Sequence, residues 1–363
     1  MTAHPQLTIR GIRARAVDAP LVHPIRTAVG EVPSAPLVLI DLATEEGVLG
    51  RSYLFAYTPV TLRALVSLLD DLEPELVGKS VAPVERMREL EMRFRLVGWQ
   101  GLIGMAVGGI DMALWDALGH AAGRPVAALL GGEPRPLPAY DSYGIIEPVR
   151  DANRLERSVE SGFRAIKIKI GGGTLEDDVH TVRETRRIIG PDVTLMVDYN
   201  QSQTVAGATE RIRRLAEFDL AWVEEPVCAD DIHGHRRVRN GVAPVPIQTG
   251  ENWWFPRGMA NAIAAGASDL AMIDVMKIGG VTGWLSAMGQ AAAASLPLSS
   301  HTFNESSAHL LAVTPTAHWL EYLDIAGAVL TERLLPHDGM VTPRGPGLGI
   351  EWDERAVQIH QWG

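Results

Sequence analysis

The sequence has 363 residues, of which 46% are hydrophobic and 21% are charged, a composition typical of a soluble globular protein. The net charge of −11, with acidic and basic residues mixed along the chain, argues against nucleic acid and anionic membranes as partners. The single cysteine, Cys228, excludes an internal disulfide, and residues 1–17 have no apolar core of signal-peptide length, so we expect a cytoplasmic protein.

The first part of the chain predicts a small α+β domain over residues 1–133. Two strand-forming segments, 7–21 and 36–54, are separated by a Pro- and Gly-containing stretch at 22–35, which predicts a loop. Residues 60–122 carry apolar side chains at helical spacing. The most apolar stretch, 101–123, contains Asp111 and Asp116, and we therefore expect a buried helix there and no membrane span.

From about residue 136, short apolar segments that end in polar residues alternate with amphipathic, helix-like segments. One of these helices begins with a predicted capping box of Thr174 and Asp177. The eight strand candidates are "LPAYDSYG", "AIKIKIGG", "VTLMVDYN", "LAWVEEP", "VPIQTGEN", "LAMIDVMKIGG", "LPLSSHT" and "AHWLEYLD". This alternation is typical of parallel strands with helical crossovers, and eight units over residues 134–325 predict a modified (β/α)8 TIM barrel.

The alternative fold is a doubly wound open sheet, but no glycine-rich dinucleotide fingerprint follows the first strand. The remaining residues, 326–363, are expected to form a C-terminal segment that packs back on the first domain.

In such a barrel, functional side chains lie at the carboxyl ends of the strands. A lone carboxylate there is usually a helix cap or a surface residue, and a lone lysine can extend to solvent. Here successive strands each end in an ionisable or polar group. Packing of the core does not require such a pattern. These residues are Ser142, Lys167, Lys169, Asp198, Asn200, Glu224, Glu225, Glu251, Asn252, Asp274, His301 and Glu321.

Asp198, Glu224 and Glu251 end three successive strands and offer three oxygen ligands without cysteine. Such a set suits a hard divalent ion, Mg²⁺, with Mn²⁺ as a substitute. His301 is either a further ligand or a base, and Asp274 on the preceding strand favours the base, because a carboxylate fixes the tautomer of the imidazole.

Lys169 is the candidate base on the opposite side, and we expect Lys167 and the metal to lower its pKa. Glu321, in its protonated form, would donate a hydrogen bond to a substrate carboxylate. Two bases that flank one centre suggest proton exchange at the carbon next to that carboxylate, with the growing charge neutralised by Lys167 and the metal.

These motifs together resemble the enolase superfamily and, within it, the mandelate racemase subgroup, across essentially the whole chain. They are "KIK" (167–169), "MVDYNQS" (196–202), "WVEEP" (222–226), "TGENW" (249–253), "DVMKIGGVTGW" (274–284), "SSHTFNESSAHLL" (299–311), "TPTAHWLEYLD" (314–324) and the linker 109–132. The resemblance implies an N-terminal capping domain on a (β/α)7β barrel, and a homo-oligomer, with an octamer as one form.

The resemblance also implies the roles of individual residues. Asp198, Glu224 and Glu251 would bind Mg²⁺, and Lys169 would act on the S-face of the substrate. The Asp274–His301 dyad would act on the R-face, Lys167 would hold the substrate carboxylate and Glu321 would be the hydrogen-bond donor. In the muconate-cycloisomerase branch a catalytic lysine stands where this chain has Asp274, so Lys277 is interpreted as structural.

Substrate contacts are implied in the same way. The expected substrate-binding residues are Ile25, Thr27, Val29, Val32, Tyr57, Leu96, Ser142 and Asn200. The first six would form an apolar pocket, although an apolar loop can also only seal a domain interface. Tyr143 replaces a histidine of the subgroup, and Arg26 and the 143–154 region also differ, which affects specificity.

Three functions remain open at this stage. The first is Mg²⁺-dependent racemisation of a mandelate-like 2-hydroxy acid, a small-molecule carboxylate, through an enolate and two bases. The second is dehydration of an acid sugar (an aldonate or aldarate) by the same machinery. The third is an inactive barrel that only binds.

Overall fold

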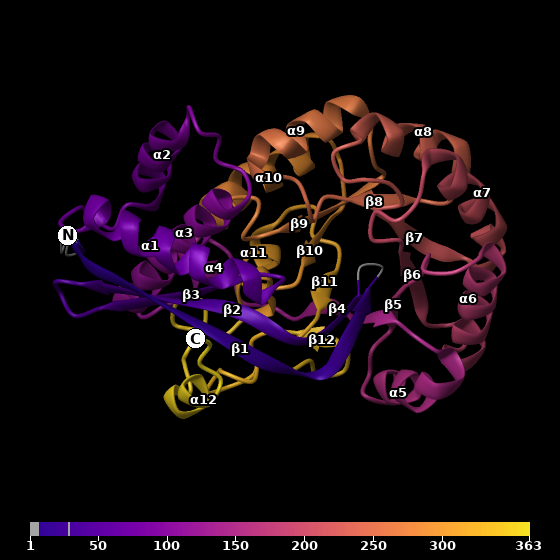
Figure 1. Ribbon diagram of the computed structural model, residues 1–363, viewed down its shortest axis with the longest axis horizontal. Coiled ribbons are helices and arrows are strands. Elements are labelled where there is room, and N and C mark those ends of the chain that lie inside the picture. Colours follow the sequence, from indigo (N-terminus) through magenta and orange to yellow (C-terminus); the bar gives the residue numbers. More distant parts are fainter. Residues whose placement is uncertain (1–6, 28–29) are drawn as a thin grey trace.

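The computed structural model describes residues 7–27 and 30–363. It consists of a cap built from a three-stranded sheet and helices, which lies against one side of a larger barrel of strands surrounded by helices (Figure 1). The cap and barrel predicted from the sequence are confirmed.

The cap sheet is antiparallel, in the order β1 (Ile9–Thr27), β2 (Gly30–Thr44) and β3 (Leu49–Phe55). Its helices are α1 (Leu62–Leu76), α2 (Pro83–Phe94), α3 (Leu102–Ala122) and the short α4 (Val126–Leu129), with a 3₁₀ turn at Pro59–Thr61. The central strand β2 buries the run from Ala35 to Ile40 on both faces, because it is covered by helices and flanked by two strands.

The loop predicted at residues 22–35 is wrong. Instead, β1 and β2 extend into a long hairpin, in which Ile25 pairs with Val32 and Thr27 pairs with Gly30. A register shift between Pro20 and Ile25 accommodates the proline-containing stretch of β1, an edge strand, and proline is tolerated at edges and bulges. This hairpin reaches over the end of the barrel (Figure 1).

The barrel strands are all parallel and all eight predicted strands are present. They are β4 (Leu137–Ile145), β5 (Ala165–Lys169), β6 (Thr194–Asp198), β7 (Leu220–Glu224), β8 (Ile247–Thr249), β9 (Leu270–Asp274), β10 (Leu298–His301) and β11 (Leu320–Tyr322). β11 pairs with β4, and the backbone N–H of Ser300 on β10 donates to the carbonyl of Trp319 at 3.0 Å. These contacts join the two ends of the strand order into a barrel. A doubly wound sheet would remain open, so that alternative is excluded.

Seven helices connect the strands, which gives the (β/α)7β form. They are α5 (Pro148–Glu160), α6 (Leu175–Ile189), α7 (Val205–Leu215), α8 (Ile232–Val242), α9 (Phe255–Ala265), α10 (Gly280–Ala293) and α11 (Asn304–Val313), with a 3₁₀ turn at Ala216–Phe218. The capping box predicted for α6 is confirmed, since Thr174 and Asp177 exchange side chain-to-backbone hydrogen bonds.

Among the described residues, α3 is the one helix long and apolar enough to cross a membrane, but 78% of that stretch is buried inside the protein. Its two acids hold it in place. Asp111 accepts a hydrogen bond from the backbone of Thr282, and Asp116 accepts from the backbones of Arg51 and Leu348. The predicted buried helix is therefore present.

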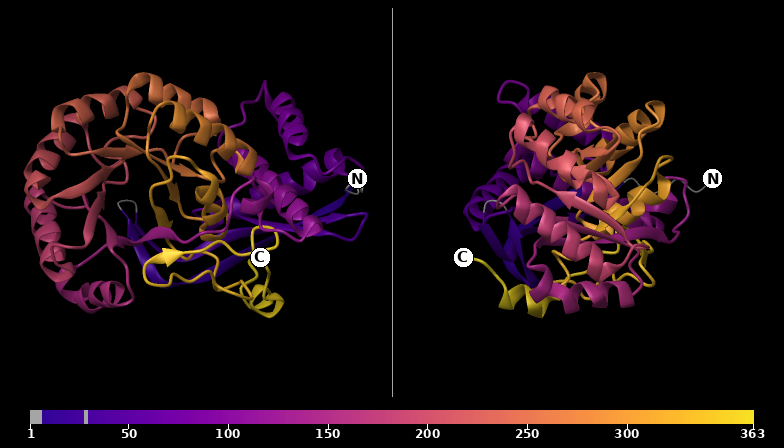
Figure 2. Two further views of the ribbon diagram at one scale, coloured as in Figure 1. Left: turned by 180° about the vertical axis from the view of Figure 1, so that it is seen from behind. Right: turned by 90° about the vertical axis from the view of Figure 1, so that its right-hand side faces the viewer.

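Residues after β11 return to the cap. The short strand β12 (Met340–Val341) pairs with β4, and α12 (Glu354–Ile359) lies beside β1 (Figure 2). The backbone of Trp362 donates to Ala16, and Asp18 donates to His360. The outer edge of the cap sheet is thus paired by this segment.

Candidate active site

The ionisable groups predicted at the strand ends lie side by side. Lys169 is paired in register with Asp198, Asp198 with Glu224, and His301 with Asp274. Because the strands are parallel and in register, their carboxyl ends place these side chains at one end of the barrel.

Three carboxylates form a candidate metal centre. Asp198, Glu224 and Glu251 are buried, and one ligand oxygen from each lies within 4.8 Å of the others. The backbone N–H of Asn200 donates to Asp198 at 2.6 Å, and the indole N–H of Trp222 donates to Glu224 at 3.2 Å, which fixes the orientation of both carboxylates. Three buried oxygens from acids, with no sulfur, suit Mg²⁺.

The charge balance of this cluster also fits a divalent cation. Burial raises the pKa of Glu224 to about 8 even though Lys167 opposes this effect, and the carboxylates of Asp198 and Glu251 add to it. Negative charge is therefore in excess among these three side chains, and a bound cation would stabilise their ionised forms.

Lys167 is fully buried between two carboxylates. Its ammonium lies 2.6 Å from Glu224 Oε1 and 2.7 Å from Glu321 Oε1. Burial alone would lower the pKa of Lys167, but the two carboxylates outweigh burial and raise it. Lys167 is therefore a permanent cation that joins the metal ligands to Glu321.

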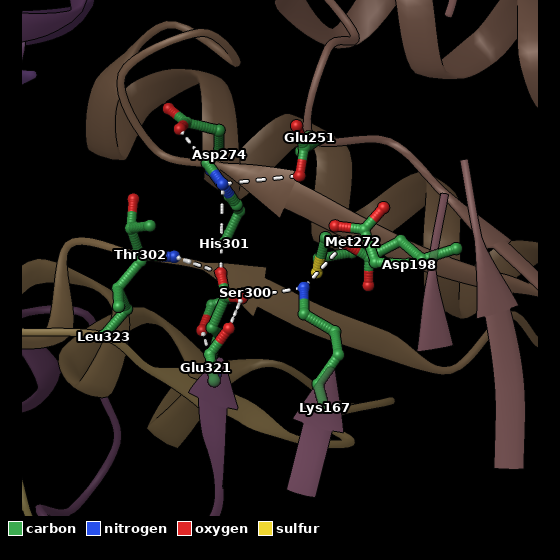
Figure 3. Close-up of polar contacts among 12 residues, drawn as sticks. Lys167, Asp198, Glu251, Met272, Asp274, Ser300, His301, Thr302, Glu321 and Leu323 are labelled. Carbon is green, nitrogen blue, oxygen red and sulfur yellow. Dashed lines mark hydrogen bonds and ion pairs between the residues drawn. The ribbon is translucent and has the colours of Figure 1, made fainter. Parts of the chain in front are cut away.

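His301 and Asp274 form the expected dyad. His301 Nδ1 lies 2.7 Å from Asp274 Oδ2, while Nε2 lies 3.4 Å from Glu251 Oε2 and 3.9 Å from Glu321 Oε2 (Figure 3). Burial lowers the pKa of His301, but the surrounding carboxylates, Glu251 first, outweigh burial and raise it to about 9.

Lys169 forms an ion pair with Asp198. The lowering of its pKa expected from Lys167 together with Mg²⁺ stays a prediction, because it depends on the bound metal. Burial and Lys167 do lower it, but Asp198 and the other carboxylates outweigh both, so the pKa of Lys169 is raised. The carboxylate in direct contact therefore outweighs Lys167, and a lower pKa of Lys169 depends on a cation bound to Asp198.

The protonated form of Glu321 is expected beside a substrate carboxylate, whereas without substrate the carboxyl group is ionised. Its carboxylate accepts hydrogen bonds from the hydroxyl of Ser142 at 2.7 Å and from the backbone of Thr302 at 3.0 Å. Burial raises its pKa, but Lys167 and His301 outweigh burial and lower the pKa of Glu321 to about 2. In this structure Glu321 is an anion and accepts hydrogen bonds.

A cavity of about 460 Å³ lies between the cap and the end of the barrel. Ten of the predicted site residues line it. They are Ile25, Thr27, Val32, Tyr57, Ser142, Lys169, Asn200, Glu251, His301 and Glu321. Lys167, Asp198 and Asp274 contact these residues from the buried side, and Glu224 contacts Lys167. Lys169 on β5 and His301 on β10 enter the cavity from different sides, because β4 and β11 separate their strands.

One of the predicted substrate contacts that the structure describes is not in the cavity wall. Leu96 is 98% exposed, because α2 ends at Phe94 and the following turn directs this side chain to solvent; its assignment to the pocket is wrong. Val29 lies outside the described residues.

Several wall residues were not predicted as substrate contacts. They are Phe55, Met105, Tyr143, Gln201, Asn252, Trp254, Lys277, Thr302 and Leu323. The sequence pattern already places Asn252 at a strand end, but without a role. Gln201 and Thr302 also follow barrel strands within a few residues, so the strand-end rule that identified Asn200 and His301 could also have identified them. Met105 on α3 reaches the cavity only because the cap packs on the barrel, and nothing in its local sequence indicates this. Trp254 lies in the loop between β8 and α9 of the barrel.

Comparisons with known proteins agree with this geometry. Residues 10–131 match the family model for the mandelate racemase / muconate lactonizing enzyme N-terminal domain, and residues 150–356 match the enolase C-terminal domain-like model. The chain belongs to the enolase superfamily, in its mandelate racemase subgroup, and it is a magnesium-dependent enzyme.

Among solved structures, an enolase from Bradyrhizobium in complex with magnesium and mandelic acid is 55% identical over the full length of both chains, with a TM-score of 0.97. A 3,6-anhydro-alpha-L-galactonate cycloisomerase from Streptomyces coelicolor is 32% identical over 89% of this chain and 91% of its own. An L-talarate/galactarate dehydratase from Salmonella typhimurium is 33% identical over 72% of this chain and 66% of its own.

Proposed function

We propose that this enzyme racemises a mandelate-like 2-hydroxy acid. The observation that carries the proposal is that two candidate bases, Lys169 and His301, enter one cavity from different sides. The apolar side chains of Ile25 and Val32 contribute to the wall opposite the barrel, as an aryl side group requires. The similarity to the mandelic acid complex supports the same substrate class.

The reaction moves one proton at the carbon next to the substrate carboxylate. One base takes the proton as the C–H bond breaks, and the electron pair passes into the carboxylate to give an enolate. The conjugate acid of the other base then donates a proton to the opposite face. Asp274 holds Nδ1 of His301, so that Nε2 is the atom that exchanges the proton.

Bound Mg²⁺ would supply positive charge beside Asp198 and Glu251, the acids that raise the pKa values of the two bases, and beside the enolate. Glu321 is ionised without substrate. A substrate carboxylate next to it would add a like charge and raise its pKa, which favours its protonated form as a hydrogen-bond donor.

The test is incubation of each mandelate enantiomer with enzyme and Mg²⁺ in D₂O. We expect the α-proton signal to disappear from the NMR spectrum of both enantiomers and the optical rotation to fall to zero. Retention of both signals would overturn the proposal.

The second candidate is dehydration of an acid sugar. It is favoured by the polar groups of Asn252, Gln201 and Lys277 in the wall, and by the similarity to the Salmonella dehydratase. In that reaction His301 would protonate the departing 3-hydroxyl as the α-proton is removed. Formation of a 2-keto acid from a panel of aldonates and aldarates, with inert mandelate, would favour this function.

A further inference from the structure

Lys277 occupies a position in the cavity wall that the reaction above does not use. It lies on the turn after β9, is buried, and lines the cavity. Its backbone N–H donates to Asp274 Oδ1 at 3.0 Å, and its ammonium lies 4.6 Å from the ring centre of Tyr57 in the cap. A buried ammonium is costly unless it has defined partners.

The main partner of this ammonium is Asn252. Lys277 Nζ donates to Asn252 Oδ1 at 2.7 Å. The amide nitrogen of Asn252 in turn donates to Glu225 Oε2 at 2.8 Å and to Glu251 Oε1 at 3.2 Å. One amide therefore connects the lysine to a metal ligand and to a second buried acid.

The lysine determines which way this amide faces. An ammonium has three donors and no acceptor, so it contacts the amide only through the oxygen, and the NH₂ group must then face the two carboxylates. Without the lysine, the amide oxygen would lose its donor, and only the two carboxylates would orient the amide through its NH₂ group. The charge of Lys277 also offsets the negative charge of the two acids.

We propose that Lys277 is a positioning residue for the metal centre: through Asn252 it holds the carboxylate of Glu251 in the orientation that binds Mg²⁺. The inference rests on the magnesium site and on no particular substrate. The hydrogen bond from Lys277 to Asp274 comes from the backbone N–H. A substitution of the Lys277 side chain therefore leaves this support of the Asp274–His301 dyad in place.

The first experiment measures Mg²⁺ affinity by calorimetry in Lys277→Met, which keeps the apolar stem and removes the ammonium. The matched control is Lys79→Met on the exposed surface, where Lys79 pairs with Glu89. We expect the dissociation constant to rise about 10- to 100-fold in Lys277→Met, as is typical for residues that orient ligands, and to change less than about twofold in the control. Equal affinity of Lys277→Met and the unmodified enzyme would overturn the inference.

Two further variants separate positioning from a general structural effect. Asn252→Leu should weaken Mg²⁺ binding as much as Lys277→Met does, and the double variant should be no weaker than either, because both act through one amide. Additive losses would show that Lys277 acts as a distant charge and would overturn the inference. Lys277→Arg, which restores donors, should recover part of the affinity.

The temperature of thermal unfolding, measured in EDTA to remove the metal, should be the same for all these proteins. If Lys277→Met does not fold, Asn252→Leu decides the question, and normal Mg²⁺ affinity in that variant would refute the inference. An unmodified enzyme that binds Mg²⁺ but does not exchange mandelate would contradict the proposed function and leave this inference standing.

Discussion

Asp274 and His301 lie at the same register of two neighbouring parallel strands, with Oδ2 of the acid 2.7 Å from Nδ1 of the ring. The pairing leaves Nε2 directed toward the cavity and assigns the exchanging proton to that atom. Lys169 enters from the far side of β4 and β11. In the proposed racemisation, each base would therefore act on a different face of the substrate.

This arrangement predicts stereospecific losses. In His301→Asn we expect exchange of the α-proton of (R)-mandelate to fall by at least about 100-fold, the usual minimum for loss of a general base. Exchange of the S-enantiomer should persist, because Lys169 remains. Lys169→Ala should show the opposite pattern. Deuterium incorporation followed by NMR measures both, and equal residual exchange of the two enantiomers in either variant would refute the two-base mechanism.

The metal centre predicts a strong effect of a small substitution. Glu224→Gln keeps the shape of a buried ligand and removes its charge, so Mg²⁺ should bind more than about 100-fold more weakly, above the range for residues that only orient ligands. The exposed Glu160→Gln is the control and should bind as before. Calorimetric titration with Mg²⁺ distinguishes them, and no binding by the unmodified protein would favour the inactive barrel.

The hairpin over the cavity predicts a steric effect at Gly144. A Cβ atom there would lie 2.5 Å from the carbonyl oxygen and 2.6 Å from the nitrogen of Arg26, between Ile25 and Thr27. Gly144→Ala should therefore displace the hairpin and raise KM for an aryl substrate by about tenfold, the effect of losing a good apolar contact. Gly289→Ala, where a Cβ meets nothing within 4 Å, is the control. An unchanged KM in Gly144→Ala would show that the hairpin does not contact the substrate.

A buried histidine outside the active site predicts how stability depends on pH. Burial lowers the pKa of His309 on α11 to about 4, and its Nδ1 accepts a hydrogen bond from the backbone of Ala127 at 3.3 Å. Between pH 6.5 and 4 the unfolded chain takes up a proton that the folded protein does not. The unfolding free energy is therefore unaffected by this group above pH 6.5. On acidification to pH 4 it falls by about 3 kcal/mol because of this group.

His309→Asn keeps an acceptor for Ala127 and removes the titration, so its unfolding free energy should fall less between pH 7 and pH 4.5. The control is His233→Asn on the surface, which should keep the dependence of the unmodified protein. Urea unfolding at the two pH values measures this difference. If the unfolding free energy fell equally between the two pH values in all three proteins, the lowered pKa of His309 would be contradicted.

Sequence reasoning succeeded where one local rule applied repeatedly. Asp198, Glu224 and His301 each end a strand, and parallel pairing alone brings such residues together. Sequence reasoning failed where contacts between distant segments determine the position or the charge of a side chain. Leu96 has a normal apolar sequence context, but the turn after α2 leaves it in solvent. The ionisation of Glu321 depends on the distances to Lys167 and His301, which no residue pattern encodes.

The pairing of β1 with residues 360–362 links completion of the cap sheet to the order of synthesis. The hairpin that carries Ile25 and Thr27 is synthesised before the barrel, yet the strand from which it extends gains its edge partner only when Trp362 has been made. All barrel strands have been translated by then. A growing chain therefore contains all the acids and bases of the candidate site before the cap sheet has its outer partner.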